Sequence, residues 1–338
     1  MRKCTLVLAV MTVVASLLEI SPTDAADHLP PVSQRFAAAD VAESPDFQRH
    51  LDPLLGKLGC NGRSCHGSFQ GRGGFRLSLF GYDFKMDHEA LLERVDTDAP
   101  ADSYAIQKGL LIEPHEGGKR FEEGSWEHHL LLKWIADGAK PVPEKAAALV
   151  RLEVTPSEVL YREAGEQTQL QAIAVWSDGT EEDVTCLCRF QSNDDAIVEI
   201  TSEGLMTSGE PGDTHVVAFY DNAVVPVPVI RPVTEQFGDK YPQLAASTPI
   251  DQAILGKLTK LGIVPSETCD DAEYLRRVSL DLAGTLPSAA DVRAFLADNS
   301  PDKRERKVKE LLETPAYVAW WTTRICDWTG CNDNQLNN

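Results

Sequence analysis

The chain has 338 residues, of which 43% are hydrophobic, 25% charged and 7% aromatic. This ordinary globular composition excludes a fibrous repeat and a wholly disordered chain, and the length predicts roughly two or three domains. The formal net charge of −20 repels a phosphate backbone, so we expect no nucleic-acid partner. Cations and basic proteins are the partners that such a charge favours.

The N-terminus has the three-part pattern of a secretory signal peptide, residues 1–25. Arg2 and Lys3 precede an apolar run over residues 6–18, and a small-residue cleavage pattern ends at Ala25. A membrane anchor is the alternative, but the apolar run is shorter than the ~20 residues that a span needs. The pattern therefore predicts export to the periplasm or the cell envelope.

Two amphipathic helices are predicted in the next segment, residues 44–145. Ser44 and Pro45 form a helix start, and Gly59 ends a helix whose apolar face follows a 3.6-residue period (Phe47, Leu51, Leu54, Leu55, Leu58). Residues 61–74 are glycine-rich and predict a loop. A second helix is expected from a Ser125 cap to Gly138.

From residue 150 to 232 the apolar period changes from 3.6 to 2, as in half-buried strands. Short strands are expected at 152–154, 170–176, 216–220 and 224–230, with turns at 177–179 and 202–204. This spacing predicts an all-β sandwich. Pro226 and Pro228 predict that the last strand lies at a sheet edge.

Residues 242–338 predict a third, α-helical segment. Apolar residues at helical spacing mark segments at 250–261, 274–282 and 308–312. Ser288 and Asp291 have the capping-box spacing and predict another helix start. The fold class expected from the sequence is thus multidomain: all-α, then all-β, then α-helical.

The stretch Cys60-Asn-Gly-Arg-Ser-Cys65-His66 is the most informative about chemistry. Two cysteines followed directly by histidine are the pattern of covalent haem attachment, in which the thiols add to vinyl groups and the imidazole binds the iron. Four residues separate these cysteines, whereas two is the usual number. A local disulfide with an incidental histidine is the alternative. A zinc site is less favoured because no second close Cys/His pair is present.

Residues 47–140 resemble the planctomycete-type cytochrome c domain, with GCNGRSCHG, GGFRLSLFGYD, PHEGGKRF and LLLKWIADGA in the expected order. The four-residue spacing between the cysteines recurs in that family. The resemblance implies a cytochrome c-like fold with one covalently attached haem c. It assigns the attachment to Cys60 and Cys65 and the proximal iron ligand to His66.

The second iron ligand is less directly indicated. Small cytochromes of this type often carry Met-Pro-Pro before the final helix, and this chain has PHEGG there. His115 is therefore the candidate distal ligand, with Met86 and His88 as competitors. His128 and His129 are expected at the surface of the closing helix.

Residues 150–232 resemble the bacterial Ig-like domain, group 2, through VRLEVTPSEVLYREAGEQTQLQAIAVWSDGTEEDVT and EGLMTSGEPGDTHVVAFY. The resemblance implies a spacer or adhesion module without catalytic activity. Cys186 and Cys188 are expected to share one face of a strand and not to pair with each other. The acidic residues of the turn and the strand after it are interpreted as a solvated edge, with a calcium site as the alternative (Asp178, Glu181, Glu182, Asp183).

Residues 242–338 resemble the start of a planctomycete domain of unknown function, through LRRVSLDLAGTLPSAADVRAFLAD and SPDKRERKVKELLETPAYVAWW. Family members usually continue further, so a shortened domain is expected, and no activity is implied. Cys326 and Cys331 repeat the four-residue spacing, but Asn332 stands where haem attachment needs histidine. A disulfide or two free thiols are expected there. Three acidic residues are interpreted as helix caps and surface groups (Asp281, Asp291, Asp298).

Three hypotheses follow. The first is an exported c-type cytochrome with an Ig-like spacer and a basic redox partner, expected to carry single electrons rather than to act as a catalyst. Peroxidase-like reactivity is the alternative if no distal ligand binds the iron. Lys119 and Arg120 are expected near a haem propionate because of their charge. The second is a non-redox envelope protein, adhesive or structural, with a Cys60–Cys65 disulfide and a surface polymer as partner. The third is an enzyme of carbohydrate or surface-polymer metabolism with its site in the C-terminal region, for which the sequence shows no motif.

Overall fold

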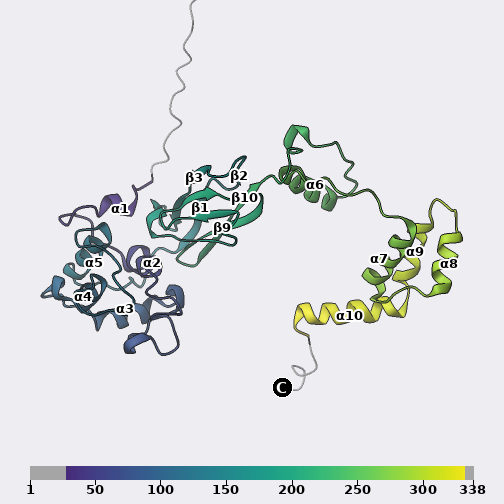
Figure 1. Ribbon diagram of the computed structural model, residues 1–338. Helices are drawn as coiled ribbons and strands as arrows, with labels where there is room; N and C mark the ends of the chain where they lie inside the picture. Colours follow the sequence, from purple (N-terminus) through teal and green to yellow (C-terminus); the bar gives the residue numbers. More distant parts are fainter. Residues whose placement is uncertain (1–27, 332–338) are drawn as a thin grey trace, which may run out of the picture. The chain divides into compact units, whose positions relative to one another are not determined.

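The computed structural model describes residues 28–331, so the predicted signal peptide lies outside the described residues. The chain divides into two compact units, Met1–Val264 and Pro265–Asn338. In chain order, a helical region is followed by a β region between residues 149 and 231 and then by helices (Figure 1). This confirms the predicted order of helical, β and helical segments.

The helical region consists of short helices and turns joined by loops. They are α1 (Val32–Arg35), the π-helical turn η1 (Phe47–Leu51), α2 (Asp52–Lys57), η2 (Arg72–Gly74), η3 (Leu79–Gly81), α3 (Phe84–Leu92), η4 (Pro100–Asp102), α4 (Tyr104–Gly109) and α5 (Trp126–Ala136). Between η3 and α5 the longest loop runs through residues 110–125. The predicted glycine-rich loop is confirmed over residues 61–71, ahead of the one-turn helix η2.

Two helix starts were predicted in this region, and they have different outcomes. Ser125 caps α5 as expected, since its hydroxyl accepts a hydrogen bond from the His128 amide. The first helix does not start at Ser44. It starts at Phe47, because the Asp46 carboxylate accepts a hydrogen bond from the Arg49 amide at 2.8 Å and so takes the capping position. Gly59 follows the end of α2 with φ of 75°, as a helix-ending glycine does.

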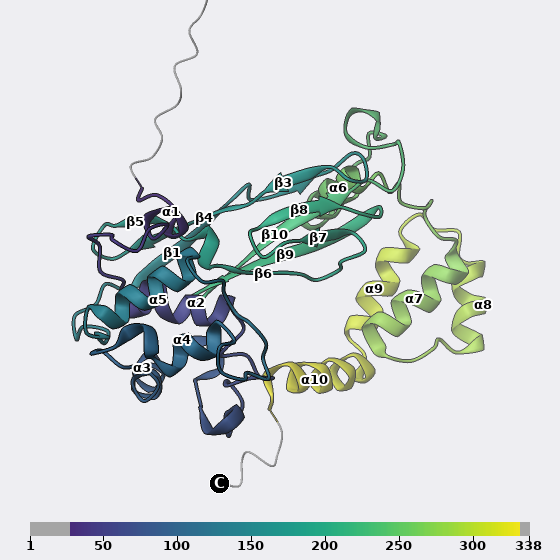
Figure 2. The same cartoon turned by 60° about the vertical axis from the view of Figure 1, so that its left-hand side comes forward.

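The β region contains ten strands: β1 (Leu149–Thr155), β2 (Val159–Leu160), β3 (Gln167–Gln169), β4 (Gln171–Trp176), β5 (Glu181–Asp183), β6 (Arg189–Ser192), β7 (Val198–Ile200), β8 (Leu205–Ser208), β9 (Gly212–Tyr220) and β10 (Ala223–Arg231). They form three sheets of order β1-β4-β5, β2-β10-β9-β6 and β3-β8-β7. Figure 2 shows β6, β9 and β10 of the second sheet side by side. All pairs are antiparallel except β2 with β10. The predicted turns at 177–179 and 202–204 join β4 to β5 and β7 to β8, with φ of 85° at Gly179 and 84° at Gly204.

The prediction that the last strand lies at a sheet edge is wrong, because β10 lies between β9 and β2. The two-residue strand β2 pairs only with Val229 and Ile230. Pro226 and Pro228 therefore pair with β9 on one side and lie outside the β2 ladder on the other. The missing proline amides cost no ladder hydrogen bond there.

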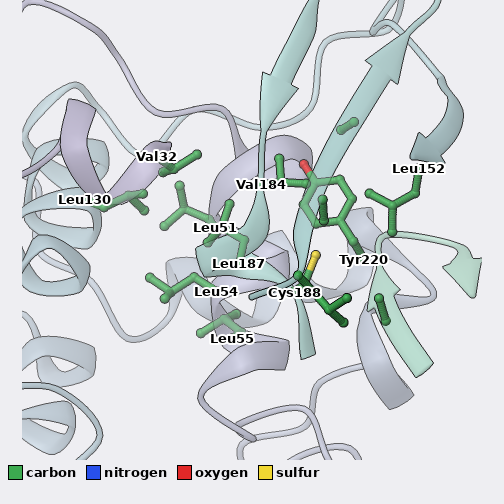
Figure 3. Packing of buried hydrophobic residues seen from close by; sticks show 14 of the residues in the cluster. Val32, Leu51, Leu54, Leu55, Leu130, Leu152, Val184, Leu187, Cys188 and Tyr220 are labelled. Atoms are coloured by element: carbon green, nitrogen blue, oxygen red, sulfur yellow. The ribbon is translucent and has the colours of Figure 1, made fainter. Parts of the chain in front are cut away.

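The helical and β regions share one hydrophobic core. Leu51, Leu54 and Leu55 pack with Leu187 and Cys188 of the β region (Figure 3). Val32 of α1 and Tyr220 of β9 belong to the same cluster, and Leu51, Leu187 and Cys188 are at most 1% exposed.

A buried polar network crosses the same interface. The Glu182 carboxylate of β5 contacts the Arg35 guanidinium and, at 2.8 Å, the Nε2 of His50. Burial, followed by the charges of Arg35 and Arg49, lowers the pKa of His50 to about 3. The Asp46 amide donates to Nδ1 of His50 at 2.9 Å, so the neutral imidazole carries its proton on Nε2 and donates it to Glu182.

The β region is followed by α6 (Pro249–Leu261), which belongs to the first unit. The second unit contains α7 (Asp271–Ala283), α8 (Ala289–Ala297), α9 (Lys303–Leu312) and α10 (Pro315–Thr329). The predicted capping box of Ser288 and Asp291 is confirmed at the start of α8. The small core of the second unit contains Leu275 and Phe295, which are both at most 5% exposed.

Candidate cofactor site

A cavity of about 550 Å³ opens in the helical region, within the roughly 300–1,000 Å³ typical of ligand sites. All four predicted haem-site residues line it: Cys60, Cys65, His66 and His115. Its wall is largely apolar (Leu51, Leu54, Leu55, Leu58, Leu91, Phe121, Leu131). Cys60 and His115 thus line the same cavity, although 55 positions separate them in the sequence.

The cysteine loop is folded tightly enough to present both cysteines and the histidine to this cavity. The His66 amide donates to the Cys60 carbonyl at 2.9 Å, and the Cys65 and Gly67 amides donate to the Gly62 carbonyl at 3.0 and 3.1 Å. A Cβ at Gly67 would lie 1.9 Å from the backbone oxygen of Asn61, so only glycine fits there. These local hydrogen bonds fold the four residues between the cysteines into a compact turn.

The two histidines are held in a matched orientation. Nδ1 of His66 donates to the Phe75 carbonyl at 3.0 Å, and Nδ1 of His115 donates to the Gly118 carbonyl at 2.8 Å. Because carbonyls only accept hydrogen bonds, these contacts place the ring protons on Nδ1 and leave the Nε2 lone pairs free. Burial lowers the pKa of His66, which keeps this imidazole neutral.

The separation of the two rings suits a shared metal ion. The ring centroids of His66 and His115 are 6.3 Å apart and the ring planes differ by 5°. Two imidazoles on opposite sides of one metal, each with a metal–nitrogen bond of about 2.0 Å, place their centroids about 6 Å apart. The backbone carbonyls that hold Nδ1 are the supporting contacts found behind metal-bound histidines.

The cysteines of the site are free thiols, as are the other five cysteines of the described residues. Burial raises the pKa of Cys60 to about 11, while the charge of Arg120 opposes that rise. Nη2 of Arg120 lies 4.0 Å from the sulfur of Cys65, and Nη1 donates to the Leu58 carbonyl at 3.1 Å. Nε of Arg120 is buried without a partner among the described residues.

The charged residues of the cavity are mostly cationic. Arg72, Arg94, Lys108 and Arg120 line it, and Glu116 is the acidic residue beside them. In a chain of net charge −20, this lining favours an anionic ligand. The sequence analysis singled out only Arg120 of these four, because the other three cations come from separate loops and helices without a motif.

Lys119, expected beside Arg120, does not line the cavity. Its ammonium group pairs with Glu122 at 2.7 Å on the exposed surface. Arg120 itself lies at the cysteine side of the cavity, so the structure brings together only one of the two predicted cations.

The competing iron ligands lie elsewhere. Nε2 of His88 donates to the Ala139 carbonyl at 2.8 Å, and its ring packs against Phe47 and Trp134 in the core. Met86 lines a separate shallow groove. Nδ1 of His128 accepts a hydrogen bond from the Gly124 amide, and Nδ1 of His129 is bound to the Ala37 carbonyl.

Two expectations for the β region are wrong. Cys186 lies in a 3₁₀ turn (η5, Thr185–Leu187) and Cys188 follows it, so they do not share a strand face. The solvated-edge interpretation fails for Glu182 and Asp183, which are 1% and 4% exposed, and Arg35 and His50 of the helical region contact Glu182. Asp178 is exposed, as expected. Among residues 28–331, no group of three or more His, Cys, Asp or Glu side chains is arranged to hold a metal ion, so nothing in this part supports the calcium alternative.

The acidic residues predicted as caps and surface groups in the second unit have local partners. Asp291 belongs to the capping box of α8, and Asp298 pairs with Arg306 and accepts a hydrogen bond from the Ser300 amide at 2.8 Å. Asp281 is exposed. No helix in the described part of the chain is long and apolar enough to cross a bilayer.

Comparisons with known proteins identify the C-terminal part alone. Residues 249–338 match the family PSCyt2, described as a protein of unknown function (DUF1549), which confirms the resemblance predicted for that segment. No curated protein matches the chain. The solved structure of the S-layer protein SbsC, domains 5-6, is 15% identical over 27% of this chain and 48% of its own, with a TM-score of 0.23. The chain thus spans about half the length of that structure.

Proposed function

We propose that the protein is an exported c-type cytochrome that carries single electrons through one haem c. Cys60 and Cys65 would attach the haem, and His66 and His115 would bind its iron. The observation that carries the proposal is the pair of parallel imidazoles 6.3 Å apart in the same cavity as two free thiols.

The residues of the cavity fit this cofactor in three respects. The leucine-rich wall excludes water from an apolar macrocycle, and the cationic lining compensates the negative charge of its carboxylates. The Nδ1–H bonds to backbone carbonyls raise the basicity of both Nε2 atoms toward iron. The two thiols lie on the loop that also carries His66.

Haem bound in this way supplies one-electron exchange at its iron. If His66 and His115 both held the iron, the site would serve electron transfer rather than catalysis. The side chains of this chain orient the cofactor, hold the protons on Nδ1 and keep the cavity dry. The partner would be a second redox protein.

For the remaining regions we propose supporting roles. The β region has the short, mostly antiparallel strands with alternating burial that an Ig-like module has, as in the pattern of β9. Export rests on the signal-peptide pattern of residues 1–25. Residues 249–338 match a family of unknown function, and no activity is proposed for them.

The test is expression in a periplasm that contains a working cytochrome c maturation system. A sharp α-band in the reduced-minus-oxidised spectrum, together with a denatured mass increased by one haem, is expected. Cys60→Ser and Cys65→Ser should each remove one thioether bond. His115→Ala should keep the haem and change the spectrum, while His128→Ala, outside the cavity, should leave it unchanged.

A colourless protein of unmodified mass would overturn the proposal. The thiols of Cys60 and Cys65 would then be structural, and a non-redox envelope protein would be the better description.

A further inference from the structure

We propose that the loop which carries the cysteines forms a docking surface for an acidic redox protein, although the chain as a whole is strongly acidic. We call this surface the basic face and define it by Arg63, Arg72, Arg76, Phe69 and Tyr82. The inference rests on the proposed function, because it assigns the charge of the electron-transfer partner.

The charge of the basic face is opposite to that of the chain. The sequence has 52 acidic and 32 basic residues, yet none of the residues from Cys60 to Tyr82 is acidic and three are arginines. Arg63, Arg72 and Arg76 are all exposed. Arg72 pairs with Glu116 at 2.5 Å, whereas Arg63 and Arg76 form no ion pair within the described residues. Two full positive charges are therefore available to a partner.

Two aromatic side chains accompany these charges. Tyr82 is 91% exposed and Phe69 is 85% exposed, and the Arg76 guanidinium lies 5.5 Å from the centre of the Phe69 ring. A groove of about 430 Å³ is lined by Phe69, Arg76 and Tyr82, and also by Asp83, whose carboxylate accepts a hydrogen bond from the Met86 amide at 3.0 Å. Arginine and aromatic residues are the types enriched at protein interfaces, and side chains this exposed gain most from being covered.

The basic face adjoins the cofactor cavity through the backbone. His66 lines the cavity, and Gly67 and Ser68, the next two residues, line the groove. Arg72 lines the cavity as well. The Leu77 amide donates to the His66 carbonyl at 2.8 Å, which fixes the groove wall to the ligand-bearing loop. A partner on this face would therefore lie one or two residues along the chain from His66, the proposed iron ligand.

The net charge of the chain and the charge of the basic face predict opposite effects of salt on the rate of electron transfer to an anionic reagent. This difference permits a sharp test. Oxidation of the reduced holoprotein by anionic hexacyanoferrate(III) moves one electron from the haem iron to the reagent. If the basic face controls the encounter, the rate should fall as ionic strength rises, by about tenfold or more. If the net charge of −20 controls it, the rate should rise.

Charge reversal identifies the surface. Arg63→Glu with Arg76→Glu should lower the low-salt rate about tenfold and abolish its fall with salt. Lys140→Glu with Lys145→Glu makes the same change in net charge at exposed positions outside the face, and it should leave the rate within about twofold. A rate that rises with salt in the unmodified protein, or equal effects of both pairs, would overturn the inference.

A second measurement needs no haem. A fluorescent poly-glutamate peptide should bind the full chain at low salt, with the fluorescence anisotropy rising, and the Arg63→Glu, Arg76→Glu pair should abolish this binding. Haem-loaded protein that does not bind the peptide would refute the acidic partner and leave the proposed cytochrome intact. Colourless protein that binds it through the two arginines would refute the cytochrome and support the surface.

Discussion

Replacing Glu182 by glutamine removes one charge from the buried network between the helical and β regions. The Glu182 side chain is 1% exposed, and it contacts Arg35 and His50. Arg35, 10% exposed, then keeps Glu43 as its only carboxylate partner among the described residues. Breaking a buried pair from one side costs about 3–5 kcal/mol because the remaining charge is left away from water. Since Glu43 remains, we expect the free energy of unfolding to fall by about 3 kcal/mol.

The assay is urea unfolding of the unmodified and substituted proteins, followed by circular dichroism. The matched control is Asp178→Asn, whose side chain is 45% exposed and pairs with Arg49 at 2.5 Å. An exposed pair contributes about 0–1 kcal/mol, so this control should change little. If Glu182→Gln lowers the free energy of unfolding no more than the control does, the buried network does not stabilise the interface and the reasoning is refuted.

Acid should destabilise the protein through His50, because burial and two arginines lower its pKa to about 3. The unfolded histidine takes a proton below about pH 6.5, so the free energy of unfolding falls between pH 6.5 and pH 3, by at most about 5 kcal/mol. His50→Gln should flatten this dependence of the unfolding free energy on pH. An unchanged dependence in the variant would contradict the prediction. Asp52→Asn should raise stability at pH 7, because burial, with the nearby charge of Asp87, raises the pKa of Asp52 well above its usual value. This stability cost is absent at low pH and grows as pH rises above about 3.8, so the gain should vanish near pH 4; a gain independent of pH would point to packing. Gly67→Ala should destabilise the protein by about 1–3 kcal/mol, since the new Cβ would lie 1.9 Å from the Asn61 backbone oxygen. The control is Gly256→Ala, whose new Cβ would have no neighbouring atom within 4 Å. Equal melting temperatures of the two variants would disprove the clash at Gly67.

The order of helical and β segments was predictable because its signals are local, and so was the grouping of Cys60, Cys65 and His66 at one cavity. Periods of 3.6 and 2 are read within about ten residues, and the two cysteines and His66 lie within seven residues of each other. His115 was found by its place before the closing helix. The structure places it 6.3 Å from His66, ring centre to ring centre.

The features that were missed depend on contacts between distant segments. Arg94 and Lys108 reach the cavity from separate elements, so no spacing connects them to the cysteines. Glu182 has the sequence setting of a solvated strand end, and it is buried only because residues more than 130 positions earlier cover it. Ser44 and Asp46 are both good capping residues, and which of them caps the first helix depends on where the π-helical turn forms.

Three leucine side chains belong to two environments at once. They line the cavity, and they are part of the core shared with the β region (Leu51, Leu54, Leu55). A change at any of these three leucines therefore acts on both environments. A substitution that reshapes the cavity also alters the packing against Leu187 and Cys188, and a β region taken from another protein would have to match this leucine surface. The sequence boundary near residue 148 divides two kinds of secondary structure, but exchange of segments at that boundary would break a single core.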